Sequence, residues 1–217
     1  MAAEIKFCGL TRPEDAVVAA ALGAAYLGVI FAGGPRLLDA DGARRVFAGV
    51  TGPARRVGVF AADAPAAIAD VASAVSLDVV QLHGDPDPGQ VDEVRRAWGG
   101  DVWAVLRIGP GPLPASAGPL FRAADAVVLD AKVSGRLGGT GVALDWLALR
   151  APLERLRGDT RLVVAGGLTP ANVTEAIGAL APAAVDVSSG VESALGIKDH
   201  ARMRAFADAV RLWGAAG

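Results

Sequence analysis

Eight short apolar runs recur along this chain, and their spacing is the feature that most limits its fold. Their starts lie roughly 20 to 35 residues apart, which is about the length of one strand–helix unit. The runs are rich in valine and nearly continuous in apolar residues, as is typical of parallel strands buried on both faces. They occupy residues 5–8, 26–31, 56–60, 78–82, 102–108, 126–130, 161–165 and 184–188.

Helical patterns fill the gaps between these runs. Thr11-Arg-Pro-Glu14 has the pattern of a capping box with a proline in the first turn. We expect it to start a helix over 16–22 that ends at Gly23, and we expect Thr169-Pro170 to cap a helix that reaches about residue 180. Further helices are predicted over 88–98 and 199–213, and a short one in the Pro- and Gly-rich connection 109–119.

Eight such units predict an α/β protein: a single (β/α)8 TIM barrel with a closed eight-stranded parallel sheet, in one domain over residues 1–217. The main competitor is a doubly wound open sheet. That fold usually has fewer strands and a glycine-rich nucleotide turn after the first. Here the first run ends in Cys8-Gly-Leu-Thr11, and no dinucleotide or Walker motif occurs.

Composition excludes several classes of function. A net charge of -2 gives no electrostatic reason to expect a nucleic-acid partner. One cysteine excludes an internal disulfide and zinc motifs built from several cysteines, and it suits a reducing cytoplasm, where we expect the protein. The uncharged stretch 16–32 approaches membrane-spanning length, but a helix, Gly23 and a buried strand explain it better, so no membrane contact is expected.

Polar residues gather where the predicted strands end, which is where TIM barrels carry their chemistry. The thiol, arginine, histidine and two carboxylates of this set are Cys8, Arg36, His83, Asp130 and Asp186. Each also has a plain structural interpretation. Cys8 could be a small core residue, Arg36 a solvated charge and His83 a structural histidine, while Asp130 could cap a helix or pair with Lys132, and Asp186 could hydrogen-bond inside the barrel.

The last two runs lead into loops that suit a phosphate group. Gly166-Gly167 precede the predicted seventh helix, and Ser188-Ser189-Gly190 follow the eighth run. Glycines let the main chain approach an anion, and helix N-termini offer free N–H groups. Tight turns alone would also explain these glycines, but the pair of loops stands where barrels usually bind phosphate.

The chain resembles phosphoribosylanthranilate isomerase, an enzyme family of tryptophan biosynthesis. The similar segments run in order over nearly the whole chain, which makes the set specific although each is weak alone. They are Lys6–Thr11, Pro35-Arg36, Val57–Phe60, Gln81–Gly84, Leu129-Asp130, Gly138–Gly141, Asp145-Trp146, Ala165–Leu168, Asn172-Val173, Asp186–Glu192 and Gly196–Asp199.

This resemblance implies an Amadori rearrangement of N-(5-phosphoribosyl)anthranilate, with no cofactor and no metal. By position, Cys8 would be the general base and Asp130 the general acid, and Arg36 would bind the anthranilate carboxylate. The remaining positions it assigns are His83, Gly139, Gly141 and Asp186 for substrate, and Gly166, Gly167, Ser188, Ser189 and Gly190 for phosphate. Two loops depart from the family pattern, at Val142-Ala143 and in the absence of a serine before Pro35.

The chemistry suits these residue types. A protonated Asp130 would open the furanose, and a thiolate would take the C2 proton of the Schiff base that results. Free cysteine has a pKa of about 8.5, and we expect the N-terminus of the helix capped by Thr11 to lower it. A histidine-pathway isomerase, which would be expected to carry aspartate in place of Cys8, and a non-catalytic phosphosugar-binding barrel are the alternatives. The sequence leaves monomer and homodimer equally open.

Overall fold

The eight predicted strands close into one ring. The computed structural model describes residues 3–109, 111–131 and 144–216. Its strands pair in parallel in chain order, and β1 pairs with both β2 and β8, which closes the barrel. The strands are β1 (Glu4–Phe7), β2 (Tyr26–Ile30), β3 (Arg55–Phe60), β4 (Val79–Leu82), β5 (Asp101–Ile108), β6 (Ala126–Ala131), β7 (Arg161–Val164) and β8 (Ala184–Val187). The predicted fold class is therefore confirmed.

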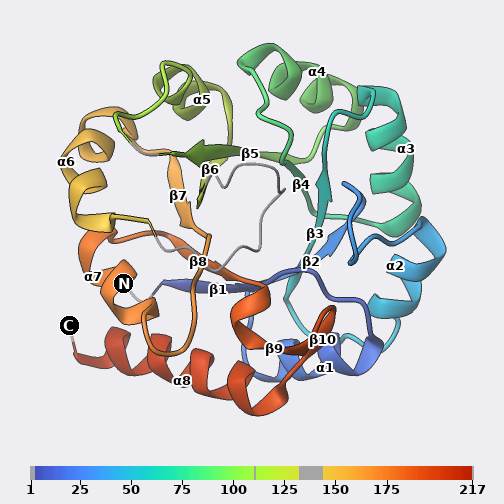
Figure 1. Cartoon of the computed structure of the whole chain (residues 1–217). Coiled ribbons are helices and arrows are strands. Elements are labelled where there is room, and N and C mark those ends of the chain that lie inside the picture. The colour runs from blue at the N-terminus through green and yellow to red at the C-terminus, as the bar shows by residue number, and fades with distance from the viewer. Residues whose placement is uncertain (1–2, 110, 132–143, 217) are drawn as a thin grey trace.

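Within the described residues, eight helices form an outer layer around this ring (Figure 1). They are α1 (Pro13–Ala21), α2 (Ala40–Phe47), α3 (Pro65–Val75), α4 (Pro88–Trp98), α5 (Ala117–Ala123), α6 (Trp146–Leu156), α7 (Val173–Leu180) and α8 (His200–Ala216). Proline stands in the first turn of α1, α3 and α4, where its missing N–H costs no hydrogen bond. Among the described residues no helix is long and apolar enough to cross a membrane.

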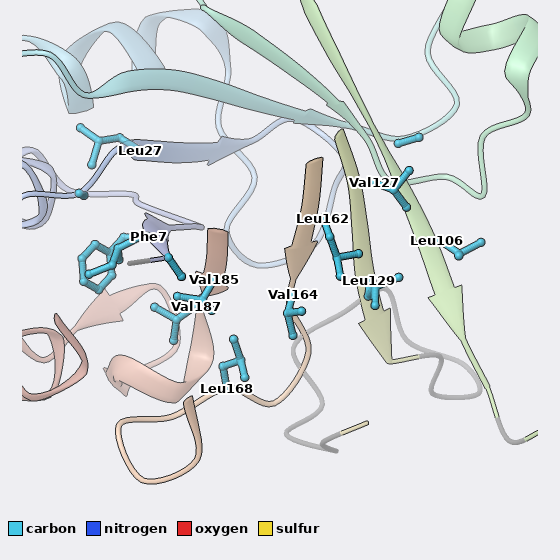
Figure 2. Packing of buried hydrophobic residues seen from close by; sticks show 14 of the residues in the cluster. Phe7, Leu27, Leu106, Val127, Leu129, Leu162, Val164, Leu168, Val185 and Val187 are labelled. Carbon is cyan, nitrogen blue, oxygen red and sulfur yellow. The ribbon is translucent and has the colours of Figure 1, made fainter. Parts of the chain in front are cut away.

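The alternation of side chains along each strand produces two cores. One set points outward and packs under the helices; Figure 2 shows part of it, with Phe7 beside Val185 and Val187 of the adjacent strand β8. The other set fills the barrel interior, where Tyr26 and Trp103 meet edge to face with ring centroids 4.8 Å apart. Residues two apart on a strand share a face, so the inward-facing side chains also include the polar residues at the carboxyl ends of the strands.

The chain adds one element that the sequence patterns did not predict. After β8 comes a short 3₁₀ turn, η1 (Ser189–Val191), and then an antiparallel pair, β9 (Glu192–Ala194) and β10 (Ile197–Lys198). This pair lies between the barrel rim and the start of α8 (Figure 1). It carries two charged residues into the site described next.

Candidate active site

A cavity of about 600 Å³ lies at the carboxyl ends of the strands and contains most of the predicted site. The strand order explains this meeting, because the carboxyl ends of all eight parallel strands lie on one rim. The predicted residues that line the cavity are Cys8, Arg36, His83, Asp130, Gly166, Gly167, Asp186, Ser188, Ser189 and Gly190. Gly139 and Gly141 lie outside the described residues, so their predicted substrate contacts stay predictions.

Asp130 is the second-last residue of β6 and is buried at the cavity wall. Its Oδ2 lies 3.2 Å from Nε2 of His83, and its Oδ1 accepts a hydrogen bond from Ala131 N at 2.9 Å. A side chain at Gly166 would stand only 2.8 Å from Oδ1, so the glycine gives this carboxyl its room. The alternative in which Asp130 pairs with Lys132 lies outside the described residues.

Cys8 follows β1 directly and is buried. Its N–H donates to Val187 O at 2.9 Å, which holds it against β8. Burial raises the pKa of the Cys8 thiol, and the positive charge of Lys6 acts against that rise. The pKa of the thiol stays above its ordinary value, and Lys6 is the group that acts most strongly in favour of the thiolate.

The predicted capping box at Thr11 is wrong. The N-cap of α1 is Arg12, with no side-chain cap, and Thr11 Oγ1 instead donates to Gly196 O at 2.6 Å. Thr11 thus connects the loop after β1 to the β9–β10 turn, because the Gly196 carbonyl lies within hydrogen-bonding distance of its hydroxyl. The predicted effect of a Thr11-capped helix on the Cys8 pKa loses its basis.

An ion pair between Lys6 and Asp186 joins the neighbouring strands β1 and β8 inside the barrel. Lys6 and Asp186 are register partners on β1 and β8, and Lys6 Nζ lies 2.6 Å from Asp186 Oδ2. The Lys6 side chain is fully buried. Asp186 thus does point into the barrel and hydrogen-bond there, as one alternative held. Its other oxygen, Oδ1, is buried without a hydrogen-bond partner within the described part of the chain.

Arg36 is a paired, half-buried residue and does not stand free in solvent. Its Nε and Nη2 donate to the two carboxylate oxygens of Glu192 at 2.8 and 2.7 Å. Lys198 Nζ lies 2.9 Å from Oε1 of the same carboxylate and also donates to Ser188 O at 3.1 Å. Burial alone would raise the pKa of Glu192, but Arg36 and Lys198 bring it below its ordinary value. The network joins Arg36 to the loop after β8.

The two glycine-containing loops meet at the cavity edge. A side chain at Gly190 would collide with Leu168 O, so the loops after β7 and β8 are in direct contact. The main-chain N–H groups of Gly166, Gly167, Ser189 and Gly190 donate to no acceptor among the residues that the structure covers. Such a group of free donors suits a dianion.

The predicted helix cap at Thr169-Pro170 is wrong. Helix α7 begins only at Val173, after the N-cap Asn172. Asn172 Oδ1 accepts from Thr169 N at 2.7 Å, which closes a tight turn of its own. Because Asn172 accepts the Thr169 N–H, residues 169–172 form a turn of their own between the glycines and helix α7.

Four residues of the site were not selected from the sequence: Lys6, Gln81, Glu192 and Lys198. Gln81 on β4 lines the cavity, and its buried Oε1 has no partner among the described residues, like Asp186 Oδ1. Both are acceptors suited to hydroxyl groups of a bound molecule. A signal was present for Lys6 and Gln81, since a polar residue inside an apolar run, two positions from a rim residue, shares its face. No such periodicity marks Glu192 or Lys198.

The chain is similar to known proteins over nearly its whole length. Residues 5–209 match the family described as N-(5'phosphoribosyl)anthranilate (PRA) isomerase. A protein of that name from Pseudomonas aeruginosa strain UCBPP-PA14 is 41% identical over 211 residues, which cover 97% of this chain and 96% of the relative. One from Pseudomonas fluorescens strain Pf0-1 is 40% identical and covers 95% and 97%.

Solved structures agree. The phosphoribosyl anthranilate isomerase of Thermus thermophilus superposes with a TM-score of 0.84 at 33% identity, covering 96% of this chain and 98% of that one. A phosphoribosyl anthranilate isomerase in complex with reduced 1-(o-carboxyphenylamino)-1-deoxyribulose 5-phosphate gives 0.81 at 31% identity, with the same coverage. The fold and these matches over nearly the full length agree, and the chain belongs to the N-(5'-phosphoribosyl)anthranilate isomerase family.

Proposed function

We propose that this protein converts N-(5-phospho-β-D-ribosyl)anthranilate into 1-(2-carboxyphenylamino)-1-deoxy-D-ribulose 5-phosphate, a step of tryptophan biosynthesis. The observation that carries the proposal is the shared cavity of a thiol, a carboxyl, an arginine and two donor-rich glycine loops. A substrate of this kind has a carboxylate at one end and a phosphate at the other. The cavity offers a matching group for each.

Asp130 is the proposed general acid. It protonates the furanose ring oxygen, the bond from that oxygen to C1 breaks, and the nitrogen lone pair forms a C1=N iminium. His83, 3.2 Å from Asp130 Oδ2, orients the carboxyl. Because the substrate's own nitrogen accepts the electrons, the proposed reaction needs no metal or other cofactor.

Cys8 is the proposed general base. Its thiolate takes the proton from C2, and the C–H electron pair forms a C1=C2 bond while the iminium nitrogen regains its lone pair. The enol then gains a proton at C1 and loses one from its C2 hydroxyl, which gives the ketose with no atom gained or lost. Single acid or base groups of this kind typically contribute about 10²- to 10⁴-fold to the rate.

The ends of the substrate are held by separate groups. Arg36 uses its Nε–Nη2 edge for Glu192 and keeps Nη1 for the anthranilate carboxylate. The N–H groups of Gly166, Gly167, Ser189 and Gly190, with the Ser188 hydroxyl, receive the phosphate. Asp186 Oδ1 and Gln81 Oε1 accept from sugar hydroxyls. A cytoplasmic location is part of the proposal, supported by the single reduced cysteine.

A coupled assay with freshly prepared phosphoribosylanthranilate tests the function. We expect turnover by the wild type, and Cys8→Ala and Asp130→Asn should each reduce kcat/KM by about a hundredfold or more. Arg150→Gln is the control, since Arg150 pairs with Glu154 on the exposed face of α6. No turnover by folded wild-type protein would favour a binding barrel without catalysis. Full activity in either site variant would remove that residue from its role.

A further inference from the structure

The proposed base must ionise to its thiolate, and one neighbour of Cys8, Lys6, favours that form. The inference drawn from this effect rests on the proposed function of Cys8. The thiol is buried, and burial favours its neutral form. The predicted capping of α1 by Thr11 is absent, and the helix begins only at Pro13. The cations near Cys8 are therefore the groups that favour its thiolate.

Lys6 is placed to be that charge. Lys6 and Cys8 are two residues apart on and just after β1, so both face the barrel interior. Both pack against Gly28 of β2: a β-carbon there would lie 3.0 Å from Cys8 Sγ and 3.3 Å from Lys6 Nζ. The bare glycine thus makes the space in which ammonium and sulfur approach one another.

Other charges also face Cys8, and they differ in how far they are already paired. Asp186 on β8 pairs with Lys6, while Arg36 and Lys198 approach from the loop after β2 and from β10. Arg36 and Lys198 both bind Glu192, at 2.7 and 2.9 Å, and that carboxylate offsets them. Lys6 has the greatest effect of the cations in favouring the thiolate, and Asp186 opposes it.

Lys6 itself is held in the charged state. Burial by itself lowers its pKa, but Asp186 and Cys8 carry that pKa above its ordinary value. Lys6 and Lys198 are both buried, and each contacts a residue that lines the cavity: Lys6 pairs with Asp186, and Lys198 donates to Ser188 O. A compact ammonium fits beside a sulfur in a closed space where the planar guanidinium of arginine would not.

We propose that Lys6 is a positioning residue for the proposed base: its ammonium favours the thiolate form of Cys8 against the effect of burial, and Asp186 limits how strongly it does so. Lys6 keeps its own protons throughout, and only the sulfur gains and loses one. The closure of the barrel contributes to this arrangement, because the pairing of β1 with β8 places Asp186 beside Lys6.

The protein's only cysteine makes a direct test possible. The rate of alkylation by iodoacetamide as a function of pH reports the ionisation midpoint of Cys8 alone. We expect Lys6→Met to raise that midpoint by about one pH unit or more, which is at least a tenfold loss of thiolate at pH 7. Asp186→Asn should lower it. Arg161→Met removes a positive charge from the opposite end of the barrel, at the start of β7, and should leave it unchanged.

A double variant keeps the test valid if Lys6→Met does not fold, because Lys6→Met alone leaves the buried carboxylate of Asp186 without its partner. Lys6→Met/Asp186→Asn keeps the pocket neutral, and its midpoint should fall between those of Lys6→Met and the wild type. The proposal is overturned if folded Lys6→Met keeps the wild-type midpoint. It is also overturned if the double variant and the single variant Asp186→Asn both keep it.

The same variants separate this inference from the proposed function. The acidic limb of the pH profile of kcat/KM should move with the alkylation midpoint. If the midpoint moves and the profile does not, Lys6 acts on the thiol as proposed, but Cys8 is not the base. If Cys8→Ala is inactive and the midpoint of the Lys6 variants is unchanged, Cys8 keeps its role and Lys6 loses its own.

Discussion

At the scale of single residues, Glu192 decides which edge of Arg36 a ligand meets. The carboxylate occupies Nε and Nη2 and leaves Nη1 directed away from that contact. Glu192→Gln keeps the shape but replaces charge-assisted bonds with weaker ones. We expect KM to rise roughly tenfold with a smaller change in kcat, as steady-state kinetics would measure. An unchanged KM would mean that Arg36 needs no such support.

Gly190 is a second residue at which we expect a small substitution to have a large effect, here on phosphate binding. A β-carbon at Gly190 would collide with Leu168 O and force the two glycine loops apart. In Gly190→Ala we expect inhibition by inorganic phosphate to weaken about tenfold or more, because the free N–H groups would no longer converge. Gly118→Ala in α5 is the control, since a β-carbon there meets only ordinary contacts. Equal inhibition in both variants would count against a phosphate site between the loops.

At the scale of elements, Asp15 fastens α1 to the end of the chain. Its fully buried carboxylate accepts from Arg12 Nη2 at 2.8 Å and Lys198 N at 3.2 Å, and its Oδ1 lies 2.8 Å from His200 Nε2 on α8. Asp15→Ala leaves these groups without their acceptor. We expect a loss of about 3 kcal/mol in the free energy of unfolding, measured by urea denaturation. A loss below 1 kcal/mol would mean that solvent replaces the carboxylate.

The same residue predicts a dependence of stability on pH. Burial raises the pKa of Asp15, but its bonds to Arg12, His200 and Lys198 bring the pKa below the ordinary value of 3.8. A group whose pKa falls on folding stabilises the protein above its unfolded pKa and loses that effect as pH falls through the folded pKa. Urea midpoints should therefore decline more steeply below about pH 4 in the wild type than in Asp15→Asn. Parallel curves would exclude this linkage.

Sequence patterns located the repeating elements better than the short ones. Strand β6 begins at Ala126 as predicted, and α4 matches its predicted range. Each has a local signal that does not depend on tertiary packing: a run of apolar residues in β6, and a proline at the start and a glycine after the end of α4. The β9–β10 hairpin has strands of three and two residues. Such lengths carry no period, so the sequence could not reveal the element that brings in Glu192 and Lys198.

At the scale of the whole molecule, the two ends of the chain stabilise each other. Phe206 of α8 is fully buried and meets Phe7 of β1 with ring centroids 6.1 Å apart. Phe206→Ala should lower the free energy of unfolding by about 3 kcal/mol or more, by urea denaturation. Leu212→Ala on the same helix is the control, because Leu212 is 71% exposed. Equal effects of the two changes would mean that α8 does not support β1.

The sequence by itself determined the eight units, the barrel and the rim on which Cys8, Arg36, His83, Asp130 and Asp186 meet. These follow from local periodicity and from the rule that parallel strands share their carboxyl edge. Only the tertiary structure decided the partners: Asp186 for Lys6, Glu192 for Arg36 and Gly196 for Thr11. The first pair is 180 residues apart in the chain, and strand register and side-chain packing, which no local pattern encodes, bring it together.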